Sequence, residues 1–298
     1  MSSGAKGRDA MFDGEIREKN KIEAGVLYLV ATPIGNLADL SERAIKVLSE
    51  VDFIAAEDTR NTAKLLTYLG ISKPMVSYHQ HNRTERGEGI CQKLQDGQSC
   101  ALVTDAGTPA ISDPGEDLVR LCAEKGIKVT FVPGACAAIA ALALSGMFTG
   151  RFVFEGFVSG AKGERRKRLE ELKNEERTMI FYEAPHKLRS TLDDMLEVFG
   201  KDRKIALCRE LTKLNEEIMR TTLSAAIEYY KENSPRGEYV LVLEGGVKQN
   251  DDFWVSLTPR EHVEHYMESG MDKSSAIKAA AKDRGVPKNE IYRIMIGS

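Results

Sequence analysis

Three loops rich in glycine, proline and small residues directly follow apolar runs, where open α/β proteins place their ligands. The longest, Asp105–Gly115 (DAGTPAISDPG), follows the apolar run Cys100–Thr104. Its two glycines and two prolines make a stiff, shaped loop whose amides can approach a ligand, and its aspartates can bind hydroxyl or ammonium groups. A structural turn in which Asp113 caps the next helix is an equally good interpretation.

The other two loops are Thr32–Leu37 (TPIGNL) and Val132–Ala138 (VPGACAA). In the second, small residues at a helix start expose free amides and leave room for a flat ligand. Tight packing between the loop and the adjoining helix is an equally good explanation of each of these two loop sequences. The chain has no GxxxxGK[ST] motif, and no GxGxxG follows its first apolar run, so the common nucleotide-binding fingerprints are absent.

Two polar clusters also follow apolar runs. Glu57-Asp58-Thr59-Arg60 places paired carboxylates beside an arginine, which suits an acceptor proton and a phosphate, or else an ion pair at a helix start. His79 and His81 are two residues apart, so on an extended segment both face one side and are candidates for proton transfer or phosphate contact. A structural role is the alternative for each histidine.

The elements that position these residues alternate between strand and helix. We expect helices from the cap Ser41 and over Thr62–Leu69, Glu88–Gln95, Leu118–Lys125 and Ala135–Leu144. Strands separated by single helices are typical of βαβ units and a largely parallel sheet with helices on both faces. The predicted strands are Val26–Thr32, Phe53–Ala56, Met75–Tyr78, Cys100–Thr104 and Lys128–Val132.

A linker near Ser145–Arg151 precedes a second α/β block, and three short helices end the chain. We predict an α/β protein with a polar, disordered leader (1–25), an N-terminal α/β domain (26–146), a C-terminal α/β domain (147–250) and a helical domain (253–298). In the second block, strands are expected at Phe152–Phe157, Thr178–Tyr182, Ile205–Cys208 and Tyr239–Leu243, and helices at Arg165–Lys173, Leu188–Phe199 and Ser224–Lys231. The final helices are expected at Pro259–Ser269, Ser274–Arg284 and Lys288–Ile296.

Composition excludes several classes of protein. The 298 residues have a net charge of −3, so any nucleic-acid partner must be held by a local basic patch. The first 25 residues have no apolar core of a signal peptide, and the longest apolar run, Ala135–Leu144, is half of what a membrane span needs. Five cysteines without CxxC spacing and five scattered histidines indicate reduced buried thiols and no metal site. We expect a cytoplasmic protein that does not enter membranes.

Several strings together resemble the tetrapyrrole methylase superfamily and, more narrowly, the bacterial 16S ribosomal RNA cytidine 2′-O-methyltransferases. Asp-Ala-Gly at Asp105–Gly107 stands where the tetrapyrrole enzymes have Gly-Asp-Pro, a departure that favours the ribosomal branch. The matching strings are VATPIGNLADLSERA (Val30–Ala44), AAEDTRNTAKLL (Ala55–Leu66), SYHQHN (Ser77–Asn82), DAGTPAISDPG (Asp105–Gly115), VPGACAAIAAL (Val132–Leu142), FYEAPHKL (Phe181–Leu188) and CRELTKLNEE (Cys208–Glu217).

This resemblance implies two α/β domains with S-adenosylmethionine bound in the cleft between them, and a helix-turn-helix-like tail. It further implies a homodimer that methylates the ribose 2′-hydroxyl of a cytidine in 16S ribosomal RNA, in the decoding region of the small subunit. The implied cofactor contacts are Pro33, Asp105, Ala106, Gly107, Ile111, Pro133, Gly134, Ala135, Cys136, Tyr182 and Leu211.

A ribose hydroxyl is a poor nucleophile near pH 7, so a base or a cation near the acceptor should help. The candidates for catalysis are Glu57, Asp58, Arg60, His79 and His81, and the sequence does not choose among them. The candidates for RNA phosphate contacts are Arg165, Arg166, Lys167, Arg209 and Lys213, for which solvated surface or structural ion pairs are the alternatives.

Two other functions fit parts of this pattern. One is a methylase of a tetrapyrrole such as a precorrin, against which the helical tail and the Arg/Lys runs argue. The other is an RNA-binding module with a vestigial cofactor cleft, against which the intact EDTR, DAGTPAISDPG and YEAPHKL strings argue.

Overall fold

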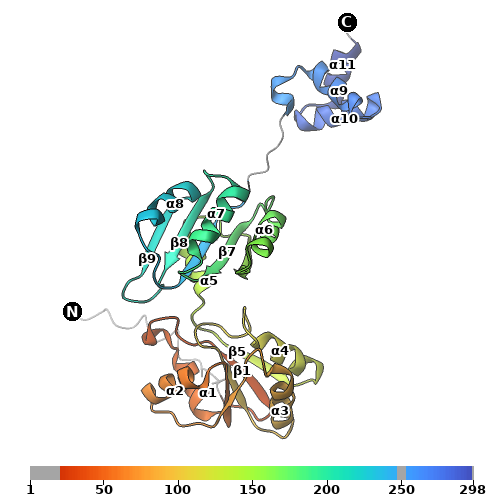
Figure 1. Ribbon diagram of the computed structural model, residues 1–298. Helices are drawn as coiled ribbons and strands as arrows, with labels where there is room; N and C mark the ends of the chain where they lie inside the picture. Colours follow the sequence, from red (N-terminus) through yellow and green to blue (C-terminus); the bar gives the residue numbers. More distant parts are fainter. Residues whose placement is uncertain (1–20, 247–252, 297–298) are drawn as a thin grey trace, which may run out of the picture. The chain divides into compact units, whose positions relative to one another are not determined.

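The computed structural model describes residues 21–246 and 253–296. The chain divides into two compact units, Met1–Glu244 and Gly245–Ser298, which we call the first and second units (Figure 1). Residues 1–20 of the predicted leader lie outside the described part. Its last residues contact the first sheet: Gly25 N donates to Gln98 O (3.2 Å), and Lys128 Nζ pairs with Glu23 (2.5 Å).

The first sheet is parallel throughout, as predicted. Its strands lie in the order β3-β2-β4-β1-β5, and all neighbouring pairs run parallel. FIAA in β2 and CALV in β4 are buried at every position, which suits interior strands covered on both faces. The strands are β1 (Val26–Val30), β2 (Phe53–Ala56), β3 (Met75–Ser77), β4 (Cys100–Val103) and β5 (Lys128–Val132).

Helices cover both faces of this sheet, as expected. Tyr28 of β1 belongs to the core beneath α1 and α2, whereas its neighbour Leu27 belongs to the core beneath α3 and α4 (Figure 1). The predicted cap Ser41 accepts a hydrogen bond from Ala44 N at the start of α1. The elements are a short 3-10 helix η2 (Leu37–Asp39), α1 (Glu42–Glu50), α2 (Thr59–Tyr68), α3 (Arg83–Gln95) and α4 (Gly115–Glu124).

The second sheet is mixed. Its order is β6-β7-β10-β8-β9; β6 and β7 are parallel, and the other pairs are antiparallel. The sequence did not predict β9, because EIMRTT has charged residues at two positions and lies at the sheet edge with no fully buried side chain. The strands are β6 (Phe152–Phe157), β7 (Thr178–Glu183), β8 (Lys204–Arg209), β9 (Glu217–Thr222) and β10 (Tyr239–Leu243).

Four helices cover the second sheet. The apolar faces of α6 (Lys162–Glu171), α7 (Leu188–Phe199) and α8 (Leu223–Glu232) share one core with it. The Ala-rich α5 (Ala137–Ser145) packs on the opposite face, against β7, β8 and β10. Helix α5 thereby joins the loop after β5 to the second sheet.

The second unit is helical, as predicted. It contains η3 (Phe253–Ser256), α9 (Pro259–Glu268), α10 (Lys273–Asp283) and α11 (Lys288–Ile296) around a small core that includes Val263, Ile277 and Ile291. Within the two described ranges of the chain, no helix is both long enough and apolar enough to cross a membrane.

Candidate active site

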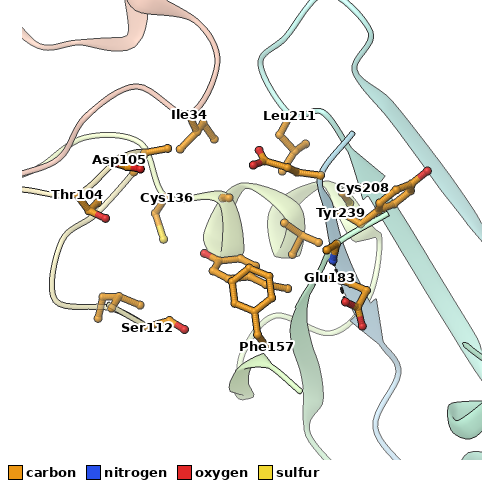
Figure 2. Close-up of a pocket in the computed structure, with 18 of the residues that line it drawn as sticks. Ile34, Thr104, Asp105, Ser112, Cys136, Phe157, Glu183, Cys208, Leu211 and Tyr239 are labelled. Carbon is orange, nitrogen blue, oxygen red and sulfur yellow. Dashed lines mark hydrogen bonds between the residues drawn. The ribbon is translucent and has the colours of Figure 1, made fainter. Parts of the chain in front are cut away.

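A cavity of about 580 Å³ lies in the first unit, within the size range of small-molecule sites. One wall consists of loops at the carboxyl edge of the first sheet, and the other consists of strand ends of the second sheet (Figure 2). The first wall includes Ile34, Glu57, Thr104, Asp105, Ala106, Gly107, Thr108, Ile111, Ser112 and Asp113. Cys136 and Ala137 line it at the start of α5, and the second wall includes Phe157, Tyr182, Glu183, Ala184, Pro185, His186, Cys208, Glu210, Leu211, Lys213, Glu238, Tyr239 and Val240.

The three loops singled out in the sequence are hydrogen-bonded to one another. Thr32 and Gly107 exchange backbone hydrogen bonds of 2.8 and 3.1 Å, and Thr108 Oγ1 donates to Ala135 O (3.0 Å). Gly107 has a φ of +85°, and a Cβ there would lie 3.1 Å from Ile34 Cγ2. Glycine is therefore required where these loops meet.

Most of the predicted cofactor contacts line the cavity. They are Asp105, Ala106, Gly107, Ile111, Cys136, Tyr182 and Leu211. Pro33, Pro133, Gly134 and Ala135 are not among the lining residues. These four belong to the loops that hold the wall, as the Thr108–Ala135 hydrogen bond illustrates.

Glu57 and Asp105 are carboxylates whose orientation is fixed by hydrogen bonds to neighbouring elements. Thr104 Oγ1 donates to Glu57 Oε2 (2.8 Å), and Asn61 Nδ2 donates to Asp105 Oδ2 (3.0 Å). The first bond joins the ends of β2 and β4, which are adjacent in the sheet, and the second joins the first turn of α2 to the loop after β4. Glu57 and Asp105 are thereby held at the cavity wall.

Asp58 and Arg60 form the ion pair that the sequence left as an alternative. Asp58 Oδ1 caps α2 by accepting from Arg60 N (2.8 Å), and the Arg60 side chain donates to both carboxylate oxygens of Asp58 (3.0 and 2.7 Å). These hydrogen bonds lower the pKa of Asp58 to about 2. Neither residue is among those lining the cavity.

His79 and His81 lie away from the cavity, because they follow β3, the edge strand, and β2 separates β3 from β4. Their rings are 5.9 Å apart, and His81 N donates to His79 Nδ1 (3.3 Å). His79 Nε2 lies 3.3 Å from Asn82 Nδ2. Of the five residues proposed for catalysis, the structure brings Glu57 alone to the cavity.

Asp113 lines the cavity and directly precedes Pro114, which is the cap residue of α4. Its Oδ1 accepts from Gly115 N (2.6 Å) at the start of α4, whereas Oδ2 is shielded from water and has no partner among the described residues. Burial raises the pKa of Asp113, although the backbone N–H groups of Gly115, Ala110 and Ile111 oppose this shift. Nearby Ala110 and Ser112 have φ of 65° and 61°, a strained conformation for residues other than glycine.

The second wall contains further functional candidates. Glu183 ends β7 and is buried; its carboxylate accepts from Ala184 N (2.8 Å) and Thr191 Oγ1 (2.5 Å). Glu210 and Thr212 have φ of 52° and 66°. With Ala110 and Ser112, these are the four non-glycine residues of positive φ in the described chain, and they lie in two loops that line the cavity.

Lys213, predicted as an RNA contact, lines the cavity. Its Nζ pairs with Glu210 (2.7 Å) and Glu238 (3.1 Å). Arg209 is the last residue of β8, just before the loop that contains Lys213, and pairs with Glu217 of β9 (2.9 Å). The position after a strand end was the sequence signal for both, but it did not show which one reaches the cavity.

Arg165 does not fit its predicted role as a phosphate contact. Its side chain is 4% exposed; Nη2 lies 2.6 Å from Asp194 Oδ2, and Nε donates to the same oxygen (2.8 Å). A phosphate cannot reach a guanidinium that faces the core between α6 and α7. Arg166 is partly exposed and pairs with Glu197 and Asp194, and Lys167 is exposed.

No cluster of metal-ligating side chains occurs among residues 21–246 and 253–296. The five cysteines are free thiols; four are buried, and Cys136 is partly exposed at the cavity.

Comparison with known proteins identifies the family. The profile of the Tetrapyrrole (Corrin/Porphyrin) Methylases matches residues 26–227. Solved structures share the fold: a cobalt precorrin-4 methyltransferase aligns with a TM-score of 0.55 and 16% identity, over 74% of this chain and 95% of that one. A uroporphyrin-III-C-methyltransferase from Thermus thermophilus aligns with a TM-score of 0.54 and 18% identity, over 74% and 94%.

Much closer sequence relatives carry the name ribosomal RNA small subunit methyltransferase I. The protein from Halalkalibacterium halodurans is 50% identical over 275 residues, covering 91% of this chain and 95% of its own length. Those from Bacillus subtilis and Synechocystis are 49% and 47% identical, over 91% of this chain and 94% and 98% of theirs. The chain therefore belongs to the tetrapyrrole methylases and, within them, to the family of ribosomal RNA small subunit methyltransferase I.

Proposed function

We propose that this protein transfers a methyl group from S-adenosylmethionine to the ribose 2′-hydroxyl of a cytidine in 16S ribosomal RNA. The observation that carries the proposal is the cavity, where glycine-containing loops with Glu57 and Asp105 at the edge of one sheet face strand ends of another. Relatives at up to 50% identity bear the name of a small-subunit ribosomal RNA methyltransferase, which supports RNA as the acceptor.

The cavity residues fit S-adenosylmethionine. Asp105 and Ala106 are exposed beside the junction of the loops, and Ile111 and Leu211 offer apolar surface to a flat base. Asp105, which Asn61 holds in place, can accept hydrogen bonds from hydroxyl or ammonium groups. When bound, the cofactor supplies a sulfonium whose methyl group is open to in-line displacement.

We propose that Glu57 accepts the proton of the ribose 2′-hydroxyl. Thr104 fixes one of its oxygens (2.8 Å), so the carboxylate faces the cavity in a defined orientation. A carboxylate held there can accept the proton as the 2′-hydroxyl reacts, and alignment of the acceptor supplies further acceleration. We propose that Lys213, at the same cavity, meets a phosphate beside that ribose.

The acceptor is proposed to be 16S RNA in the assembled small subunit, in its decoding region. With a net charge of −3, the chain is expected to bind naked RNA weakly and to depend on local cations such as Arg166 and Lys167. We also propose that the protein is cytoplasmic and forms a homodimer, with the helical second unit serving RNA positioning or dimerisation.

Small ribosomal subunits that lack the modification test this function. Incubated with the enzyme and tritiated S-adenosylmethionine, they should yield label in 2′-O-methylcytidine after nuclease digestion. Glu57→Gln should reduce labelling strongly, whereas Asp58→Asn, a change of the adjacent carboxylate outside the cavity, should not. Absence of label in that nucleoside would overturn the proposal, and turnover of a precorrin in its place would favour the tetrapyrrole reaction.

A further inference from the structure

Leu214 is an apolar side chain that contacts nothing in the fold. It is 100% exposed, the highest fraction among the large apolar side chains that the structure describes. It lies near the tip of the loop Glu210–Glu216, which joins β8 to β9. An isolated leucine on a surface is ordinary, so its meaning depends on how it is supported and what lies beside it.

The loop that carries Leu214 is tightly held. Lys213 N donates to Glu210 O (3.0 Å), and Glu216 N donates to Lys213 O (3.1 Å). The Glu216 side chain accepts from Thr212 N (2.7 Å), closing the loop from the other side. With Glu210 and Thr212 in the left-handed conformation, the backbone is set in one strained shape that projects Leu214 outward.

The same loop forms part of the cavity wall. Glu210, Leu211 and Lys213 all line the cavity, so Leu214 directly follows a lining residue. Lys213 Nζ is further anchored by Glu238, at the start of β10. A rigid, exposed apolar tip therefore lies one residue along the chain from the cavity wall.

Entry of that nucleotide has a physical requirement. A ribose in a stacked strand is fixed by its neighbours, and a 2′-hydroxyl must approach the methyl group in line. Enzymes that act on a base displace its nucleotide from the stack, and apolar side chains such as leucine can serve as wedges between bases. Resting on the proposed function, we infer that Leu214 inserts beside the target cytidine and holds it out of the stack, so that its ribose reaches the cavity.

The inference is tested with Leu214→Ala, with Leu214→Met as the variant that keeps an apolar wedge. Tyr68→Ala is the control, because Tyr68 is 66% exposed on α2 and does not line the cavity. Single-turnover methylation is measured on small subunits and on two short RNAs, one with the target cytidine stacked in a stem and one with it unpaired in a bulge. A 2-aminopurine next to the target reports unstacking in the stem RNA.

Leu214→Ala should slow methylation of the subunits and the stem RNA by about tenfold or more, while the bulged RNA reacts at nearly the wild-type rate. It should also abolish the fluorescence rise that the wild type produces, and leave S-adenosylmethionine binding unchanged. Leu214→Met and Tyr68→Ala should behave like the wild type. If the wild type is active and Leu214→Ala methylates the stem RNA at the same rate, the wedge is overturned and the proposed function is not. An equal loss of rate on the stem RNA and the bulged RNA has the same consequence. A wild type inactive on subunits and both RNAs overturns the proposed function and the wedge with it.

Discussion

The hydroxyl of Thr104 donates a hydrogen bond of 2.8 Å to Oε2 of Glu57 and thereby joins the ends of two adjacent strands at the cavity. A carboxylate that accepts a proton in a reaction must be held in one orientation to do so efficiently. Thr104 provides that restraint from β4, while the backbone of β2 positions Glu57.

Thr104→Val removes this donor and keeps the branched shape of the side chain. We expect kcat for methyl transfer to fall by about tenfold, because Glu57 loses its fixed orientation, with little change in cofactor affinity. Thr104→Ser keeps the hydroxyl and should retain most of the activity. Stopped-time methylation assays at saturating cofactor measure the difference, and a wild-type kcat for Thr104→Val would show that Glu57 needs no such restraint.

Asp105→Ala removes the carboxylate that Asn61 orients at the cavity. We expect the Kd for S-adenosylmethionine to rise by about tenfold, the loss of one hydrogen bond to a charged group. Titration calorimetry measures it, with Asp58→Ala as a control whose carboxylate faces Arg60 outside the cavity. Equal affinity in Asp105→Ala and the wild type would remove Asp105 from the cofactor site.

The first wall of the cavity follows from local sequence, and the second does not. Short apolar runs such as FIAA and CALV that alternate with helices indicate buried parallel strands, so the residues after them were expected to meet at one sheet edge. The second wall depends on the order β6-β7-β10-β8-β9, where β10 lies between two strands far from it in sequence. Nothing in the sequence around Glu183, Glu238 or Tyr239 specifies that order.

The burial of Arg165 could have been predicted from the helical period, but the run of basic residues favoured an exposed role. Arg165 and Leu169 are four residues apart, and both are buried, so they share the core-facing side of α6. The run of four basic residues drew attention to charge, whereas the helical period places one of them on the inner face. Its carboxylate partner, Asp194, comes from α7 and has no local signal.

Arg165→Ala is therefore expected to act on stability. It would leave the buried Asp194 with only the longer contact to Arg166 (3.6 Å) and free the carbonyls of Ser159 and Gly160, to which Arg165 Nη1 donates (3.4 Å each). We expect a loss of about 3–5 kcal/mol in the free energy of unfolding. Urea denaturation measures this loss, and Arg166→Ala, on the partly exposed neighbour, should cost much less. An unfolding midpoint for Arg165→Ala within error of the wild type would contradict a structural role.

Arg166→Ala combined with Lys167→Ala tests the remaining basic surface of α6. Binding of RNA weakens as salt rises, so a plot of log K for binding against log salt concentration has a negative slope. If both side chains neutralise RNA phosphates, this slope should become shallower by about 0.7 to 0.9 for each side chain removed. Filter binding of small subunits between low and physiological salt gives the slope. The ion pairs of Arg166 with Asp194 and Glu197 compete for its charge, so Lys167→Ala alone should account for most of the change. An unaltered slope would exclude α6 from the RNA footprint.

Asp113→Asn tests the buried carboxylate of the cavity loop through the pH dependence of stability. Burial raises the pKa of Asp113 above its ordinary value of 3.8, so the folded protein holds this proton more tightly than the unfolded chain does. Below pH 3.8 both states are protonated and ionisation of Asp113 costs nothing. As pH rises above 3.8 the unfolded chain ionises first, and the folded state loses stability until the folded pKa is passed.

Asparagine keeps the acceptor for Gly115 N and replaces the unpartnered oxygen by a neutral amide. We therefore expect Asp113→Asn to raise Tm by about 2 °C at pH 7 and to leave it unchanged near pH 3. A group that destabilises the fold at a binding site commonly serves the ligand. The variant should therefore also bind S-adenosylmethionine more weakly. Thermal scans across this pH range check the first effect, and calorimetry at pH 7 checks the second. A Tm gain of equal size at both pH values would show that the charge of Asp113 is not its cause, since only the ionised carboxylate carries the penalty.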